Sequence, residues 1–241
     1  MKQIVLLTTF LTFISFSSCE LLENVDAGLS DLEIANGLKE ALLVGTDSSV
    51  AALNVEDGYL ADEAVKILLP EEVQSVQGTI EDVVPGARAL LDDVVVRLNR
   101  AAEDAASEAT PIFVDAITGI TITDARDILF GEDTAATFYL ESNTREQLVN
   151  AYAPQINTSL DAVGLPTLWE QIANPYNEYA NGFVGQALGA EPIPDDLGAY
   201  VTNKALDGLF LKVQDKEADI REDVNERVND VLRRVFGELD N

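Results

Sequence analysis

An apolar stripe with helical spacing, kept for about six turns near the middle of the chain, constrains the fold more than any other feature of the sequence. It lies at about residues 86–109 and consists of Leu90, Leu91, Val94, Val95, Leu98, Ala101, Ala102 and Ala105. Residues at that spacing share one face of an α-helix, and an apolar face of this length has to be buried against other elements. The alanines in its second half would let a neighbouring helix approach closely.

The segment after residue 29 carries signals for the start and end of a helix. Ser30 and Glu33 have the spacing of a capping box, in which the serine side chain accepts from a backbone amide and the glutamate reaches back to the cap. Gly45 is a residue type that commonly ends a helix. We therefore expect one helix that stops at Gly45 and a further short helix capped by Thr46 or Asp47.

Similar signals continue toward the C-terminus. Thr123 is expected to cap a helix over residues 124–130, and Thr144 and Gln147 have the spacing of a second capping box. Residues 164–194 are rich in proline and aromatic side chains, which favours an irregular segment with short helices. Because no series of alternating strands and no fixed-period repeat appears, the sequence predicts an all-α fold, a single domain of about eight to ten helices without a substantial sheet.

The first twenty residues have the pattern of a bacterial lipoprotein signal peptide. Lys2 precedes an apolar run over residues 4–16, and Ser17 and Ser18 stand directly before Cys19, the only cysteine in the chain. Small residues before a cysteine at this distance resemble a lipobox, where the thiol is diacylated and the chain is cut before the cysteine. An ordinary signal peptide with a chance cysteine is one alternative. An uncleaved transmembrane helix is another, but it would need about 20 apolar residues.

We therefore expect residues 1–18 to be a cleaved signal peptide, residues 19–30 a lipidated tether, and residues 31–241 the helical domain. With Cys19 acylated, no thiol remains for an intrachain disulfide, so packing must hold the domain together. The acylated Cys19 predicts a membrane as one partner and the bacterial cell envelope as the location. The outer membrane is favoured over the inner one, and the sequence leaves open whether the domain faces the periplasm or the exterior.

The charge balance excludes some classes of function. Asp and Glu number 43 against 15 Lys and Arg, which gives a net charge of −28, and histidine is absent. Such a surface repels the phosphates of nucleic acids, so no nucleic-acid partner is expected. The lack of histidine removes Ser-His-Asp and Cys-His triads and zinc sites that use histidine. A basic protein or a divalent cation would fit the charge, although a solvated acidic coat explains it as well.

Polar residues interrupt the apolar stripe at Asn99, Arg100 and Glu103. Asn99 and Glu103 are four positions apart and share a helix face. One interpretation is that the cluster lines a ligand pocket. The other, which we favour, is that these side chains tie neighbouring loops or helix ends to the helix, because buried polar groups must be paired. Glu217 and Arg221 have the same spacing and are expected to form a helix salt bridge worth a few tenths of a kcal/mol.

Asp124, Arg126 and Asp127 form a second group of weak ligand candidates. Carboxylates in the first turn of a helix complement its macrodipole, which suffices to explain them. With Glu132 and Asp133 nearby, they could also supply oxygens to Ca²⁺, which takes about six to eight. The EF-hand calcium-loop pattern Asp-x-Asp-x-Asp-Gly is absent, so we expect no metal site and no cofactor, and Ca²⁺ remains the one ion to test.

Several short blocks occur in an order and spacing typical of one protein family. They are GLKEAL (37–42), DGYL (57–60), LNRAAE (98–103), TDARDIL (123–129), AATFYL (135–140), YVT (200–202), ALDGLF (205–210), IR (220–221) and VFG (235–237). Over about residues 32–237 the chain resembles domain-of-unknown-function family 4197 of bacterial envelope proteins. The resemblance implies a secreted or lipid-anchored helical domain and brings no established activity, cofactor or catalytic residue. Family members often carry a proline soon after the Ile-Arg pair, which this chain lacks, so a helix break there stays open.

Two hypotheses for the function follow from the sequence. The one we favour is a lipid-anchored, non-enzymatic helical protein of the envelope with a binding or structural role and an envelope protein as partner. The alternative is a carboxylate- or divalent-cation-dependent enzyme or small-ligand carrier in the periplasm. A closed, water-poor pocket into which the polar candidates converge would favour the alternative. A solid core in which they are paired would favour the first.

The charge predicts a gradual response to salt and no specific response to calcium. Repulsion among 28 uncompensated negative charges is screened within about 8 Å at physiological ionic strength, so added NaCl should raise the melting temperature gradually. Thermal melts in NaCl and CaCl₂ at matched ionic strength measure this. A calcium-specific rise that is lost in the Asp124→Asn, Asp127→Asn variant would contradict it, because a ligand that binds the folded state stabilises it beyond screening.

Overall fold

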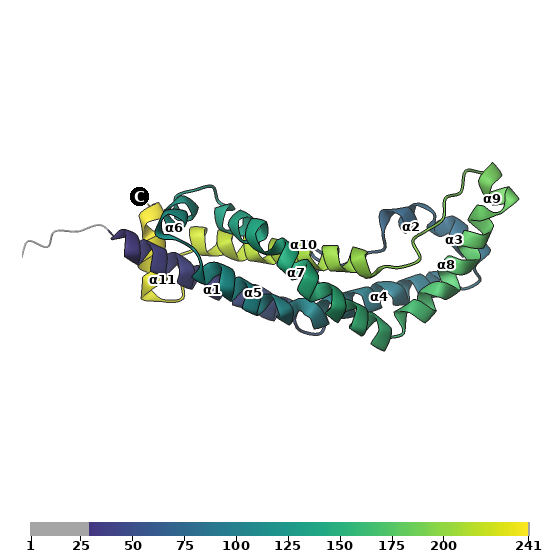
Figure 1. Ribbon diagram of the computed structural model, residues 1–241, viewed down its shortest axis with the longest axis horizontal. Helices are drawn as coiled ribbons and strands as arrows, with labels where there is room; N and C mark the ends of the chain where they lie inside the picture. Colours follow the sequence, from purple (N-terminus) through teal and green to yellow (C-terminus); the bar gives the residue numbers. More distant parts are fainter. Residues whose placement is uncertain (1–28, 241) are drawn as a thin grey trace, which may run out of the picture.

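Helices make up every regular element of the computed structural model, which describes residues 29–240 (Figure 1). In chain order they are α1 (Asp31–Leu53), α2 (Glu71–Ser75), α3 (Gln77–Val83), α4 (Ala87–Ala105), η1 (Ala106–Glu108), α5 (Ala109–Thr118), α6 (Ile122–Leu129), α7 (Ala135–Ala162), α8 (Leu165–Asn181), α9 (Phe183–Ala187), α10 (Gly198–Glu222), α11 (Asp230–Phe236) and η2 (Gly237–Asp240). No strand occurs among the described residues, so the all-α prediction is confirmed.

Residues 1–28 and residue 241 lie outside the described part of the chain, and with them the predicted signal peptide, Cys19 and most of the predicted tether. Within residues 29–240, no helix combines the length and the apolar character that crossing a bilayer requires.

The helices form an elongated bundle built along α7 and α10 (Figure 1). These two run in opposite directions and pack against each other, and at 1.5 Å per residue they are roughly 40 Å long. At one end α1 packs against α5, α6, α10 and α11; toward the other end α4 packs against α7 and α8. The start of α1 and the C-terminus therefore lie at one end of the bundle, and α9 lies at the opposite end.

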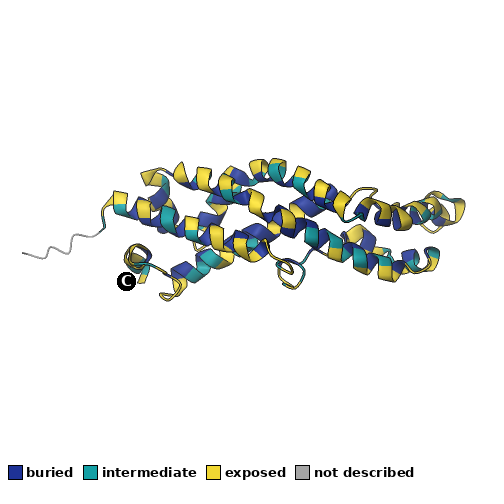
Figure 2. Cartoon of the chain, turned by 90° about the horizontal axis from the view of Figure 1, so that it is seen from below, coloured by how far each residue is buried: buried dark blue, intermediate teal, exposed yellow. Residues whose placement is uncertain are grey.

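The apolar faces of the helices meet along the whole length of the bundle, as the buried positions in Figure 2 show. The alanines Ala101, Ala102 and Ala105 are fully buried, and α4 packs on α7 as their small size predicts. Gly208 marks a second close approach, because a Cβ there would lie 2.9 Å from the Tyr59 ring and 3.1 Å from Val65 Cβ. The loop of residues 54–70 can therefore lie directly on α10.

The first helix shows where the expected boundaries hold and where they do not. The capping box of Ser30 and Glu33 is present, with Glu33 N donating to Ser30 Oγ at 3.3 Å and Ser30 N donating to Glu33 Oε2 at 2.9 Å. The predicted stop at Gly45 is wrong, since α1 continues to Leu53. A glycine inside a helix costs about 1 kcal/mol, which packing against α10 offsets. Thr46 caps nothing, and its hydroxyl donates to Leu42 O within α1.

Other boundaries also differ from the expected ones. The cap of α6 is Thr121, which forms a capping box with Asp124, so the expected cap at Thr123 is wrong. Thr144 begins no helix; it is buried inside α7 and donates its hydroxyl to Leu140 O. The stretch expected to be irregular contains the regular 17-residue α8. A helix break does follow the Ile-Arg pair without a proline, because α10 ends at Glu222.

Leu98 and Leu209 are both fully buried in this core, and we expect each to be important for stability. Replacing either with alanine removes buried methyl groups and leaves a cavity, which should lower the free energy of unfolding by about 2–5 kcal/mol. Urea unfolding of Leu98→Ala and Leu209→Ala measures the loss, with Leu188→Ala as the exposed control. Losses below about 0.5 kcal/mol would contradict the buried placement.

Candidate functional site

Asn99 on α4 is fully buried and holds the backbone of the preceding loop. Its side-chain oxygen accepts from Ile67 N at 2.8 Å, and its Nδ2 donates to Ile67 O at 2.8 Å and to Val95 O at 2.8 Å. An asparagine side chain has two donors and one acceptor oxygen, so both donors are used. Asn99 therefore fixes one residue of an extended loop segment against the helix and presents no free donor to a ligand.

Glu103, one turn further along α4, holds the same loop at a second point. Its Oε1 accepts from Tyr59 N at 3.1 Å and from Leu60 N at 3.2 Å, and its Oε2 lies 2.6 Å from Arg100 Nη1. Arg100 extends the chain of contacts, since its Nη2 lies 2.7 Å from Asp57 Oδ1. We call Asn99, Arg100 and Glu103 with the loop residues that they contact the loop clamp.

Tyr59 connects the loop clamp to α10. Its hydroxyl donates to Ala205 O at 2.8 Å, and burial, with Tyr152 and Glu103 adding to it, raises the pKa of this phenol well above its usual range. The phenol therefore keeps its proton and its role as a donor at physiological pH. The three polar residues thus tie the loop to α4 and Tyr59 ties it to α10, which is the arrangement that a positioning role requires.

The second group of candidates lies on α6, at the other end of the bundle from α8 and α9 (Figure 1). Asp124 accepts from Thr121 Oγ1 at 2.7 Å and from Thr121 N at 3.1 Å, and these hydrogen bonds lower the pKa of its carboxyl. Arg126 forms an ion pair with Asp31 on α1 and stacks over the Phe130 ring at 5.6 Å. Asp127 is exposed. Across residues 29–240, no group of three or more Asp, Glu or Cys residues is placed to hold a metal ion.

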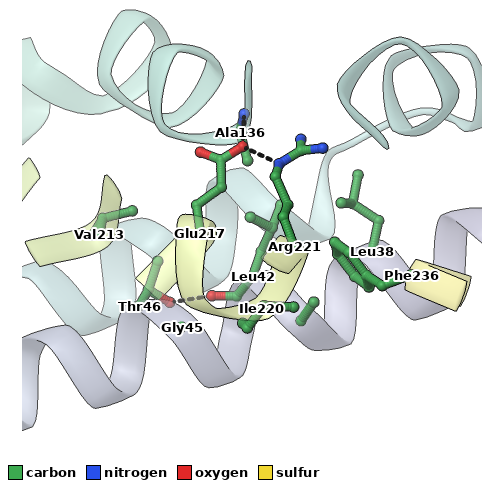
Figure 3. Close-up of a pocket in the computed structure, with 11 residues that line it drawn as sticks. Leu38, Leu42, Gly45, Thr46, Ala136, Val213, Glu217, Ile220, Arg221 and Phe236 are labelled. Atoms are coloured by element: carbon green, nitrogen blue, oxygen red, sulfur yellow. Dashed lines mark hydrogen bonds and ion pairs between the residues drawn. The ribbon is translucent and has the colours of Figure 1, made fainter. Parts of the chain in front are cut away.

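The structure assigns a larger role to Glu217 and Arg221 than the expected helix salt bridge. Both are buried, and Glu217 faces the start of α7 from its position on α10 (Figure 3). Glu217 Oε1 accepts from Ala136 N at 2.9 Å, while Oε2 accepts from Thr137 N and from Thr137 Oγ1, both at 2.8 Å. The Nε of Arg221 donates to Glu217 Oε1 at 3.0 Å. We call this set the Glu217–Arg221 cluster.

Each charge of the cluster also meets the helix end of opposite polarity. Arg221 donates from Nη2 to Ile128 O at 2.8 Å and from Nη1 to Leu129 O at 3.0 Å, which are carbonyls at the end of α6. Glu217 accepts from the first amides of α7. Helix C-termini carry partial negative charge and N-termini partial positive charge. The cluster therefore caps α6 and α7 at once and joins both to α10.

A cavity of about 20 Å³ lies beside this cluster, between α1 and α10 (Figure 3). A hollow must measure about 10–15 Å³ to hold one water molecule, so this one has room for a single water. Its wall is mainly apolar, with Leu38, Leu42, Val213 and Phe236 beside Glu217. A cavity of this size does not hold a substrate or a cofactor.

Larger hollows are open to solvent. A groove of about 520 Å³ between α1 and α10 is lined by Lys212 and Lys216, among others. The Nζ of Lys212 lies 2.6 Å from Asp62 Oδ2, and that of Lys216 lies 2.8 Å from Asp219 Oδ2. Their charges are compensated by these neighbours, so the groove is weakly suited to binding an anion.

Arg227 is a buried residue that the sequence reasoning missed. Its Nε donates to Ile220 O at 3.0 Å and its Nη2 donates to Arg221 O at 2.8 Å, which caps the end of α10. It also forms a two-contact ion pair with Asp240, which raises the pKa of Arg227 and lowers that of Asp240. The one available signal was a basic residue shortly after a helix end, which is too common to single out a buried side chain.

Comparison with known proteins finds one family. A family model described as a protein of unknown function (DUF4197) matches residues 28–237, a span that includes every α-helix of the structure. No curated protein matches the sequence, and no solved structure matches it. The description of the family names no activity.

We expect the Glu217–Arg221 cluster to be a main source of stability. Removing one partner of a buried ion pair leaves the other charge uncompensated, so Glu217→Ala should lower the free energy of unfolding by about 3–5 kcal/mol. Urea unfolding measures this, with the exposed Glu222→Ala on the same helix as the matched control. The control should change stability by less than about 0.5 kcal/mol. Equal losses in the two variants would contradict the capping role.

Proposed function

We propose that this chain, which belongs to a family of proteins of unknown function (DUF4197), is a lipid-anchored, non-enzymatic protein of the bacterial cell envelope that acts by binding or in a structural role. The proposal combines the N-terminal sequence pattern with the way in which the candidate polar residues are used.

The proposal that the protein is not an enzyme depends on one observation, which is that the candidate polar residues bond to backbone atoms of the protein itself. Asn99 and Glu103 bond to backbone atoms of the loop of residues 54–70, and Glu217 and Arg221 bond to backbone atoms at the ends of α6 and α7. An acid, base or nucleophile has to reach a substrate with a group that is free to react. These side chains are already engaged in holding the fold together. Their engagement supports a function that is performed by the surface of the protein.

The short stretch of sequence between Cys19 and the start of α1 supports a lipid anchor close to one end of the bundle. Leu29, the first described residue, comes ten positions after Cys19, and ten positions span at most about 35 Å. Acyl chains on Cys19 would therefore keep the end of the bundle that holds α1, α6 and α11 near the membrane, and two chains anchor a protein firmly where one is marginal. The opposite end, with α8 and α9, would point away or lie along the surface (Figure 1).

Lipidation of Cys19 is directly testable. Metabolic labelling of the full chain with a fatty-acid analogue should label the wild type and leave Cys19→Ser unlabelled, because the thiol is the acylated group. Immunoblots of whole cells check that both chains are made, so that a missing label reports the missing thiol. Equal label in the two chains would end the proposal of a lipid anchor.

A further inference from the structure

The helix α9 forms the end of the bundle opposite to the start of α1 (Figure 1). It packs chiefly against α8, and together with Leu188, which follows it directly, it holds the two most exposed large apolar side chains of the described residues. Phe183 is 88% exposed, Leu188 is 73% exposed and Val184 is 59% exposed. We call these three residues the distal tip. Exposed apolar residues gathered at one end of a protein commonly mark an interaction site.

The backbone that presents the distal tip is tightly built. A Cβ on Gly185 would lie 2.2 Å from Tyr179 O and 2.8 Å from Ala180 Cα, so only glycine lets α9 fold this closely onto the end of α8. Gly185 O accepts from Ala190 N at 2.9 Å. These contacts close the turn at the end of the bundle and set the direction of α9.

The segment that leaves the distal tip is also held. The side chain of Asn177 on α8 accepts from Ile193 N at 2.8 Å and donates to Ile193 O at 3.0 Å. Trp169 Nε1 donates to Pro194 O at 2.8 Å. Both ends of the tip are thus fixed to α8, so a partner would bind a preformed surface and lose little free energy in ordering it.

The charged residues nearest to the distal tip along the chain are acidic. Residues 179–190 carry no charge, and no Lys or Arg occurs over residues 146–203, which hold seven Asp and Glu. Glu178 and Glu191 are exposed on either side of the tip. At the same end of the bundle, α2 and α3 add further acids, and the start of α4 adds one basic residue, Arg88. The tip is an apolar surface with an acidic border.

We propose that the distal tip docks onto a partner protein whose surface presents an apolar pocket bordered by Lys or Arg. Apolar side chains at the centre of a contact supply most of the binding free energy, and a border of opposite charge speeds association and excludes wrong partners. This docking proposal rests on the binding role proposed above, because it states the kind of partner that the protein would bind. It does not depend on acylation of Cys19, which is tested separately.

Two other occupants fit the surface less well. A second copy would bring two acidic borders together, and like charges across an interface disfavour the contact. A bilayer with anionic lipids would repel the acidic border, whereas peripheral membrane surfaces are usually basic. A basic protein surface meets both the apolar and the charged features.

Site-specific photocrosslinking in cells of the native host tests the proposal. A photoreactive phenylalanine analogue is placed at Phe183 of the full chain and, as the matched control, at Phe138, which is 72% exposed near the opposite end. We expect a discrete protein adduct at position 183 and none of the same size at position 138. Mass spectrometry of the adduct should map the contact to a peptide with apolar residues next to Lys or Arg.

Two variants on the crosslinkable chain separate the apolar from the electrostatic contribution. Leu188→Ser and the pair Glu178→Lys with Glu191→Lys should each lower the adduct yield about fivefold or more, while urea unfolding stays unchanged because these side chains are exposed. An adduct with lipid, with a second copy or with a peptide that lacks basic residues would overturn the proposal. So would equal yields at both positions, yields unaffected by the variants, or no adduct. If Cys19 is labelled and no adduct forms, the anchor stands and the docking proposal fails.

Discussion

A carboxylate and a guanidinium buried side by side on α10 determine how the helices around them are arranged. Glu217 accepts from two backbone amides of α7, and Arg221 donates to two backbone carbonyls of α6, so both buried side chains have polar partners on other helices. Any shift of α6 or α7 would break backbone hydrogen bonds to one of these buried side chains, at a cost of about 1–3 kcal/mol for each polar group left unpaired and more for a charged one. The pair therefore does more than stabilise one helix, since it defines how three helices meet.

The sequence blocks that carry the family resemblance come together in space at two places. Blocks 57–60, 98–103 and 205–210 meet in the loop clamp, where Tyr59 reaches α10 and Gly208 leaves room for its ring. Blocks 123–129, 135–140 and 220–221 meet in the Glu217–Arg221 cluster. In both places side chains of one element hold the backbone of another. The polar side chains that suggest a ligand or catalytic site in the sequence therefore hold the fold together.

The two ends of the bundle differ in a way that suits a protein with an attached end and a free end. The start of α1 and the C-terminal helices occupy one end, where Arg126 and Arg234 form ion pairs with acids in the first turn of α1. The other end lacks such cross-links at α9 and exposes uncharged, apolar residues. The cavity between α1 and α10 has room for about one water, and for this reason our proposal assigns the interaction to the surface.

The sequence by itself determined the all-α class, the long helix over α4, the Ser30 capping box and the shared face of Asn99 and Glu103, because each depends on residues within a few turns of one another. Tertiary structure decided where helices end. It carried α1 through Gly45 and kept Thr144 inside α7, since packing between helices outweighs local stop and start signals of about 1 kcal/mol. It also decided which backbone amides the two buried glutamates accept from. The amides that donate to Glu103 are at least 43 residues away in sequence, and those that donate to Glu217 are at least 80 residues away. Local sequence patterns cannot predict such partners, because a buried charged side chain bonds to backbone groups that only the folded chain brings close to it.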